Sequence, residues 1–238
     1  MINIFFIPYA GSTSMGLQYW GNYFPEDYRF IPVKFAGRGE RSKEALYKDF
    51  ADGLNDVTRF ITKEIDKYKE DDYVVFGHSM GGLLAYEVYY QLLKNHQKPP
   101  LSIFISARKA PMIGTMIKRE CDCNDDEFLE IVSLFGGLNE SFNNEEVRKA
   151  FVPILRADFK LLETYHYTEK KEKIKCDVTL LYGNKDATLD FIKLPRWNEC
   201  TERKCEIIEF NGGHFFIQDE MAKISKIIVS RTQFQLLI

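Results

Sequence analysis

With 238 residues, of which 45% are hydrophobic, the chain can bury one large core, and we expect a single α/β domain over residues 1–238. The formal net charge of −3 excludes the basic excess that a nucleic-acid-binding surface needs to neutralise phosphates. Five cysteines, none of them in a C-x-x-C pair, indicate reduced thiols rather than a disulfide framework or a metal site.

The N-terminal stretch is apolar, but it lacks the basic region of a secretory signal. No apolar run approaches the roughly 20 residues of a membrane span. We therefore expect a cytoplasmic protein with no membrane or nucleic-acid partner, and we also expect a monomer.

Strand and helix patterns alternate along most of the chain. Short apolar runs rich in β-branched and aromatic residues predict strands over residues 4–7, 28–33, 73–78, 101–106, 178–183 and 205–210. Apolar residues at helical spacing predict helices over residues 17–24, 49–68 and 83–93. This alternation favours a mostly parallel central sheet with helices on both faces, whose ligands bind beyond the carboxyl ends of the strands.

The alternation stops between about residues 112 and 167. Two helical stripes, over 128–135 and 147–165, follow one another without a strand, and Pro153 predicts a kink or a restart in the second. Gly136-Gly137 supplies a break that can serve as a hinge. Because the insertion follows the strand at 101–106, it should lie over the carboxyl edge of the sheet, and we interpret it as a helical lid. Ordinary core helices are the alternative.

The strand at 73–78 ends in a G-x-S-x-G motif, Gly77-His78-Ser79-Met80-Gly81, and a helical pattern begins at once. This strand-turn-helix context indicates a nucleophile elbow with Ser79 at its tip. Glycine is expected at both ends of the motif because a Cβ there would clash with the strand or the helix. The backbone N–H of Met80 should then face the oxygen on the carbon that Ser79 attacks.

A nucleophilic serine needs a base within hydrogen-bond reach, and the base needs an acid that holds it. In this type of fold the three residues follow one another along the chain as serine, then aspartate or glutamate, then histidine. His214 follows a strand in a loop whose two glycines let it fold back over the sheet edge, so it is the predicted base. Asp186, just past the strand at 178–183, is the predicted acid, with Asp190 as the main alternative. The second oxyanion donor is expected from the N–H of Ala10, in the loop after the first strand. The residues predict a serine hydrolase that needs no cofactor or metal.

These motifs together resemble the type II thioesterases that accompany nonribosomal peptide and polyketide synthases, and less closely the medium-chain thioesterases of animal fatty acid synthase. The matching stretches lie at 6–11, 36–41, 77–82, 106–111, 155–158, 163–165, 183–186 and 212–216, nearly end to end. The resemblance implies an α/β-hydrolase fold with a lid, a triad of Ser79, Asp186 and His214, and oxyanion donors at Ala10 and Met80. The chain departs from the family pattern at Ser12, Lys109 and Ala187, where the family usually has glycine, arginine and proline.

The resemblance also implies an activity and a partner. Such thioesterases remove stray acyl groups from the phosphopantetheine arm of carrier domains, so an acyl or peptidyl carrier protein is the expected partner. Carrier domains are usually acidic, and Arg38 and Arg41, in the loop after the second strand, are predicted to contact them. The lysines within 170–175 are a less favoured candidate.

Three other activities stay open at this point. The chain can be a medium-chain acyl-carrier-protein thioesterase of fatty acid synthesis, or a carboxylesterase or lipase that acts on free esters. It can also be a binding module on a degenerate hydrolase scaffold, although all three residue types of a triad occur in the expected order.

Overall fold

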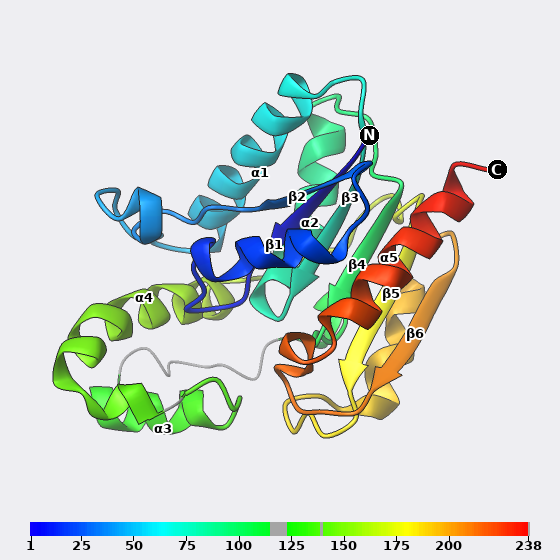
Figure 1. Cartoon of the computed structure of the whole chain (residues 1–238). Helices are drawn as coiled ribbons and strands as arrows, with labels where there is room; N and C mark the ends of the chain where they lie inside the picture. The colour runs from blue at the N-terminus through cyan, green and yellow to red at the C-terminus, as the bar shows by residue number, and fades with distance from the viewer. Residues whose placement is uncertain (115–122, 139, 238) are drawn as a thin grey trace.

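The central sheet has six strands, all parallel, in the order β2-β1-β3-β4-β5-β6 (Figure 1). The computed structural model describes residues 1–114, 123–138 and 140–237. The strands are β1 (Ile2–Ile7), β2 (Tyr28–Pro32), β3 (Asp72–His78), β4 (Ser102–Ser106), β5 (Asp177–Gly183) and β6 (Cys205–Phe210). Each lies at a predicted position, and the predicted parallel α/β class is confirmed.

Helices cover both faces of this sheet. The α-helices are α1 (Phe50–Lys67), α2 (Met80–Lys94), α3 (Asp125–Ser133), α4 (Glu145–Glu163) and α5 (Met221–Gln235). The longer 3₁₀ helices are η1 (Met15–Tyr23) and η6 (Phe191–Glu199), and the short ones are η2 (Gly39–Arg41), η3 (Pro111–Ile113), η5 (Glu140–Asn143) and η7 (Phe216–Gln218). α1 and α2 pack on one face, while η1 and α5 pack on the face turned toward the viewer in Figure 1. No helix of the described residues is long and apolar enough to cross a membrane.

β1, which lies between β2 and β3, is buried on both faces of the sheet. Ile4 and Phe6 face η1 and α5, whereas Phe5 and Ile7 face α1 and α2. All four side chains are fully buried. A parallel strand covered on both faces has no polar side, which is why residues 4–7 of β1 form an apolar run in the sequence.

The strand order creates a crevice at the carboxyl edge of the sheet. After β1 the chain moves outward to β2, and then returns to place β3 on the other side of β1. The loops that follow β1 and β3 therefore leave the sheet side by side and diverge. Such a switch point is where parallel α/β sheets bind their ligands, and here it brings the loop after Ile7 next to Ser79.

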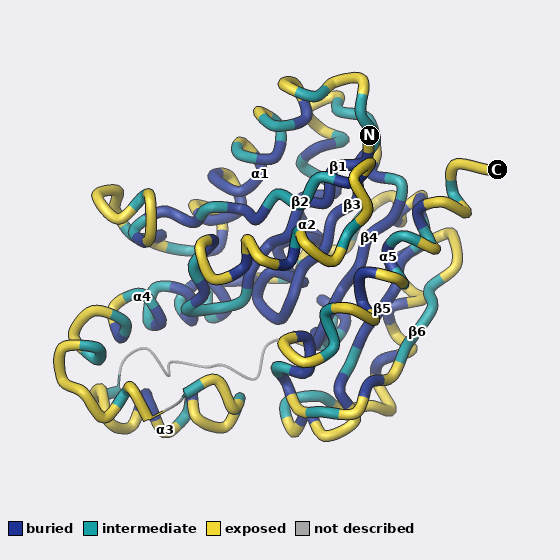
Figure 2. Tube along the Cα trace, viewed as in Figure 1, coloured by how far each residue is buried: buried dark blue, intermediate teal, exposed yellow. Residues whose placement is uncertain are grey.

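The predicted insertion lies between β4 and β5, beyond the carboxyl ends of the strands (Figure 1). It contains η3, α3, η5 and α4, and residues 115–122 within it lie outside the described residues. α4 continues through Pro153, so the predicted restart there is wrong. Figure 2 shows that α3 and the first turns of α4 are largely exposed, whereas the residues in the second half of α4 are buried or half-buried.

The two residues that follow α4 join its C-terminal end to the body of the protein by polar contacts, in addition to the apolar packing of the helix. Thr164 Oγ1 accepts a hydrogen bond from the N–H of Phe50 at 2.9 Å. The hydroxyl of Tyr165 donates to Glu87, also at 2.9 Å. The insertion thus combines an exposed part with a part that packs against the core.

Candidate active site

Ser79 stands in a strained turn between β3 and α2. Its φ is +55° and its ψ is −113°, and its N–H continues the β3–β4 ladder by donating to the carbonyl of Ser106 at 2.8 Å. A Cβ on Gly81 would lie 1.9 Å from the carbonyl oxygen of Ile7, and one on Gly77 would lie 2.1 Å from that of Gly81. The backbone thus leaves no room for a side chain at either position, as the motif predicted.

Two loops from distant parts of the chain bring a histidine and a carboxylate to Ser79. His214, in the loop after β6, places Nε2 at 2.8 Å from Ser79 Oγ. Its Nδ1 lies 2.8 Å from Oδ2 of Asp186, in the loop after β5. All three residues are buried. Asp190, the alternative acid, is instead exposed and pairs with Lys193 at 2.7 Å.

Thr188, which the sequence analysis did not single out, completes the contacts of Asp186. Its N–H and its hydroxyl both donate to Asp186 Oδ1, at 2.9 and 2.6 Å. The same hydroxyl oxygen lies 3.2 Å from His214 Nδ1 and can accept from an N–H there. Both oxygens of Asp186 are therefore occupied, one by His214 and the other by Thr188, which fixes the plane of the carboxylate.

Burial and neighbouring side chains shift the pKa values of Asp186 and His78. Burial opposes ionisation of Asp186, but hydrogen bonds from His214 and Thr188 outweigh it and hold the pKa of the carboxyl below its usual value. His78 lies behind His214, with the two rings 5.3 Å apart, and its Nδ1 contacts Ser106 Oγ at 2.9 Å. Burial and the neighbouring His214 hold the pKa of His78 well below its usual value. At neutral pH His78 is thus uncharged and places no positive charge beside His214.

Two backbone donors that lie near Ser79 have no hydrogen-bond acceptor among the described residues. Met80 is the first residue of α2, and Ala10 lies in the loop after β1. No hydrogen bond between described residues has the N–H of either as donor. Ala10 and Ser79 line the same cavity. Both N–H groups therefore remain available to an oxygen that enters the site.

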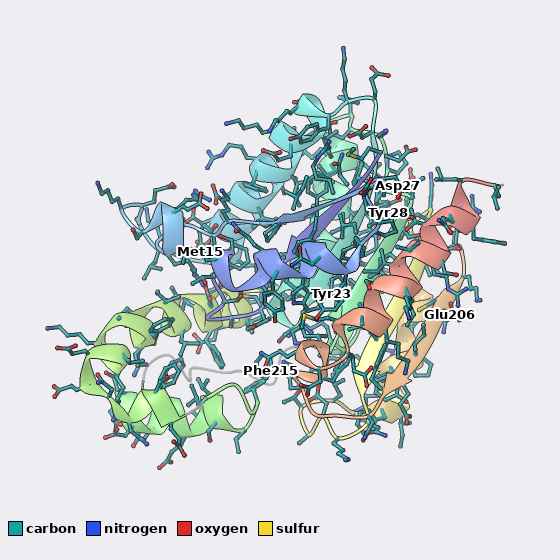
Figure 3. The ribbon with its side chains drawn as sticks, in the orientation of Figure 1. Met15, Tyr23, Asp27, Tyr28, Glu206 and Phe215 are labelled. Atoms are coloured by element: carbon teal, nitrogen blue, oxygen red, sulfur yellow. The ribbon has the colours of Figure 1, made fainter. Side chains whose placement is uncertain are left out.

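A cavity of about 420 Å³ opens directly onto Ser79 and His214. The inserted segment supplies much of its wall, with apolar side chains at Val132, Phe135, Leu138, Phe142, Phe151, Leu155, Phe159 and Leu162. Phe215, labelled in Figure 3, lies between this segment and the body of the protein. Among the described lining residues there is no Asp, Glu, Lys or Arg. An uncharged apolar group fits this wall, whereas a charged group against it would lose its hydration without gaining a counter-charge from the described lining residues.

The two arginines predicted to contact a carrier are already paired. The side chain of Arg38 is 2% exposed, and both of its terminal nitrogens contact Asp158, at 2.5 and 2.6 Å. Arg41 lies at 2.5 Å from Glu44 and at 2.6 Å from Asp56. A buried guanidinium has no surface for a partner, so the structure contradicts the predicted contact for Arg38. The charge of Arg41 is balanced locally, which weakens its case.

Comparison with known proteins adds an independent observation. The family model described as "Thioesterase domain" matches residues 3–232. The gramicidin S biosynthesis protein GrsT of Aneurinibacillus migulanus is 27% identical over 219 residues, which cover 92% of this chain and 84% of that protein. The medium-chain S-acyl fatty acid synthase thioesterase of Anas platyrhynchos is 26% identical over 217 residues, covering 89% and 84%. The crystal structure of ClbQ, from the colibactin NRPS/PKS pathway, superposes with a TM-score of 0.93 at 26% identity and covers 99% of this chain and 98% of that chain.

Proposed function

The chain belongs to the thioesterase domain family, and from this premise we propose that it is a type II thioesterase that hydrolyses acyl thioesters on the phosphopantetheine arm of carrier proteins. The observation that carries this proposal is the buried line of hydrogen bonds from Ser79 through His214 to Asp186, at the base of an apolar cavity. Its biological role would be to clear misprimed acyl groups from a nonribosomal peptide or polyketide synthase.

In this reaction Ser79 Oγ attacks the thioester carbonyl while His214 Nε2 takes its proton. Asp186 holds the Nδ1–H tautomer and stabilises the imidazolium that forms. The N–H groups of Ala10 and Met80 bind the oxyanion. The C–S bond then breaks, and the thiol leaves readily because its pKa is only ~8.5. The proton on His214 passes to the leaving sulfur, which makes the imidazole available again as a base. Water, activated by His214, then releases the acyl group from Ser79.

The carrier partner is supported by the similar proteins rather than by a surface of this chain. GrsT is named for gramicidin S biosynthesis, and ClbQ for a pathway of the NRPS/PKS type. Both match this chain over more than nine tenths of its length. The medium-chain fatty acid synthase thioesterase is the second candidate function, because it matches over a similar share and its substrate would fit the same apolar cavity.

The cavity also suggests a class of acyl group. Its wall carries phenylalanine, leucine and valine, and no charged side chain among the described residues. Burying a carboxylate there without a partner is strongly unfavourable. We therefore expect the enzyme to prefer uncharged apolar acyl groups over malonyl groups, whose carboxylate would face this wall.

A single panel of substrates tests the proposal. The same carrier protein is loaded with decanoyl or with malonyl, and decanoyl is also offered as its 4-nitrophenyl ester. We expect kcat/KM for decanoyl on the carrier to exceed that for malonyl on the carrier by about tenfold or more, the equivalent of ~1.4 kcal/mol. We also expect it to exceed kcat/KM for the ester.

The controls separate the competing functions. Faster turnover of the free ester than of the carrier-bound group would indicate a carboxylesterase. Loading decanoyl on a carrier from fatty acid synthesis and on one from a peptide or polyketide synthase compares the two thioesterase roles. A higher kcat/KM on the fatty acid carrier would favour the second candidate.

We further propose that 1–238 forms one domain, in which α3, η5 and the first half of α4 form the moving part of a lid. The support is that these elements are largely exposed, with Phe128, Leu129 and Val132 the only buried residues of α3, whereas the second half of α4 is buried or half-buried. Amide hydrogen exchange should be fast over 125–150 and slow over 155–163, and an acyl ligand should slow it mainly in the first range. Equal protection of both ranges, with and without ligand, would instead support the alternative that the inserted helices are ordinary core helices.

A further inference from the structure

Asp158, on α4, is fully buried, and three donors from two different loops converge on its carboxylate. The N–H of Gly11 donates to Oδ2 at 2.7 Å. The two terminal nitrogens of Arg38 lie at 2.5 Å from Oδ2 and at 2.6 Å from Oδ1. The exposed fraction of the Asp158 side chain is 0%. Nothing in the triad requires this arrangement, so it calls for an explanation of its own.

The contact with Gly11 holds the loop that carries Ala10. Gly11 follows Ala10 directly, and the loop is also closed by a hydrogen bond from the N–H of Ser12 to the carbonyl of Tyr9 at 3.2 Å. Leu155 of α4 packs against the same loop, with its Cδ2 at 2.6 Å from where a Cβ on Gly11 would lie. The loop is therefore held by its own turn and by one helix.

Arg38 has a supporting part in this arrangement. A buried carboxylate without a counter-charge is strongly unfavourable, and the two parallel hydrogen bonds from the guanidinium supply that charge in a fixed geometry. The pairing also orients the carboxylate, so that Oδ2 faces Gly11. An ionised acceptor binds a backbone N–H more strongly than a neutral one does.

We propose that Asp158 is a positioning residue for the thioesterase reaction, which sets the N–H of Ala10 at the oxyanion by fixing Gly11. The inference rests on the proposed function, since it assigns Asp158 a part in the same reaction. The helix that carries Asp158 also lines the acyl cavity with Leu155 and Phe159. One helix therefore positions both the acyl group and the oxyanion donor. This keeps the carbonyl oxygen of a bound thioester aligned with the N–H of Ala10.

Two double variants separate positioning from simple packing. Arg38→Gln with Asp158→Asn removes both charges but keeps an amide oxygen that can accept from the N–H of Gly11. Arg38→Met with Asp158→Leu replaces the pair by apolar side chains of similar size and leaves that N–H without an acceptor. Replacement of a buried ion pair in this way commonly preserves folding.

The main measurement is kcat and KM of the two double variants and of the wild type on a small acyl-pantetheine. We expect the Met/Leu variant to have a kcat about 10- to 100-fold below that of the Gln/Asn variant, with KM within about twofold, because an oxyanion donor acts mainly in the transition state. An acyl trifluoromethyl ketone, which forms a tetrahedral adduct, should lose affinity by a similar factor. Equal kcat in the two variants, or a change in KM alone, would overturn the inference.

Two further measurements keep the test decisive. Arg38→Lys retains the charge but loses the paired hydrogen bonds, so it should lower kcat relative to the wild type by a smaller factor than the Met/Leu variant does. If the Met/Leu variant does not fold, an unchanged kcat in Arg38→Lys refutes the inference. Labelling of Ser79 by a fluorophosphonate reports whether the nucleophile is intact. Failure of the proposed function would appear separately, as wild-type enzyme that does not hydrolyse carrier-bound thioesters.

Discussion

The Ser79→Ala variant is expected to lose a factor of about 10⁴ to 10⁶ in kcat while its fold is retained. Removal of Oγ leaves no atom that can form the acyl-enzyme, and the remaining rate would come from the oxyanion donors and substrate binding alone. Ser79 is held by backbone contacts, including its N–H to Ser106, and alanine keeps these. The loss should therefore appear in activity and not in thermal stability.

The measurement is hydrolysis of decanoyl on a carrier protein by variants of equal melting temperature. Ser42→Ala, at an exposed serine outside the cavity, is the matched control and should keep wild-type activity. A fluorophosphonate should label the wild type and Ser42→Ala but not Ser79→Ala. A well-folded Ser79→Ala variant with more than about a tenth of the wild-type kcat would end the assignment of Ser79 as nucleophile.

The strands were predictable because burial on both faces leaves a strong local signal. Within β1 and β3, residues 4–7 and 73–76 are apolar runs of β-branched and aromatic residues, followed directly by Pro8 and Gly77. α5 was not predicted. Its buried positions include Ser225 and Thr232 beside Ile224 and Ile228, so the helix has only a narrow apolar stripe.

η1 shows the limit of helical spacing as a signal. The apolar residues near Leu17 and Trp20 indicated a helix, and the chain forms a 3₁₀ helix over Met15–Tyr23 instead. Gly16 and Gly21 lie within this segment and lower its α-helical preference. Leu17 and Trp20, which stand three residues apart, are the two residues that it buries, and this spacing suits a 3₁₀ turn.

The part of the candidate site that lies directly after strands was predictable from the sequence. Ser79, Asp186 and His214 each follow a strand, and parallel strands end at one edge, so their meeting follows from topology. Thr188 contributes through the conformation of its loop, which no local pattern encodes. The burial of Arg38 depends on a partner 120 residues away in the sequence, which a local motif cannot indicate.

The Asp186→Asn variant is expected to lose about 10⁴ in kcat, because an amide would hold His214 in the wrong tautomer. Asp190→Asn should change kcat by less than about twofold, since that carboxylate is exposed and contacts Lys193 rather than His214. Both are measured on the same carrier-bound acyl group, with circular dichroism to confirm folding. The opposite order of effects would move the acid to Asp190.

The contacts of Thr188 explain why the asparagine should have no harmless orientation. The N–H and hydroxyl of Thr188 both donate to Oδ1, so the amide oxygen of an asparagine would be held on that side. Its NH₂ group would then face Nδ1 of His214 and require a lone pair there. The ring proton would move to Nε2, which lies 2.8 Å from Ser79 Oγ and could no longer take the proton of the nucleophile. Thr188→Val removes the hydroxyl but keeps the backbone N–H on Oδ1, so adding it to Asp186→Asn should restore none of the lost kcat, and a clear recovery would contradict this account of the loss.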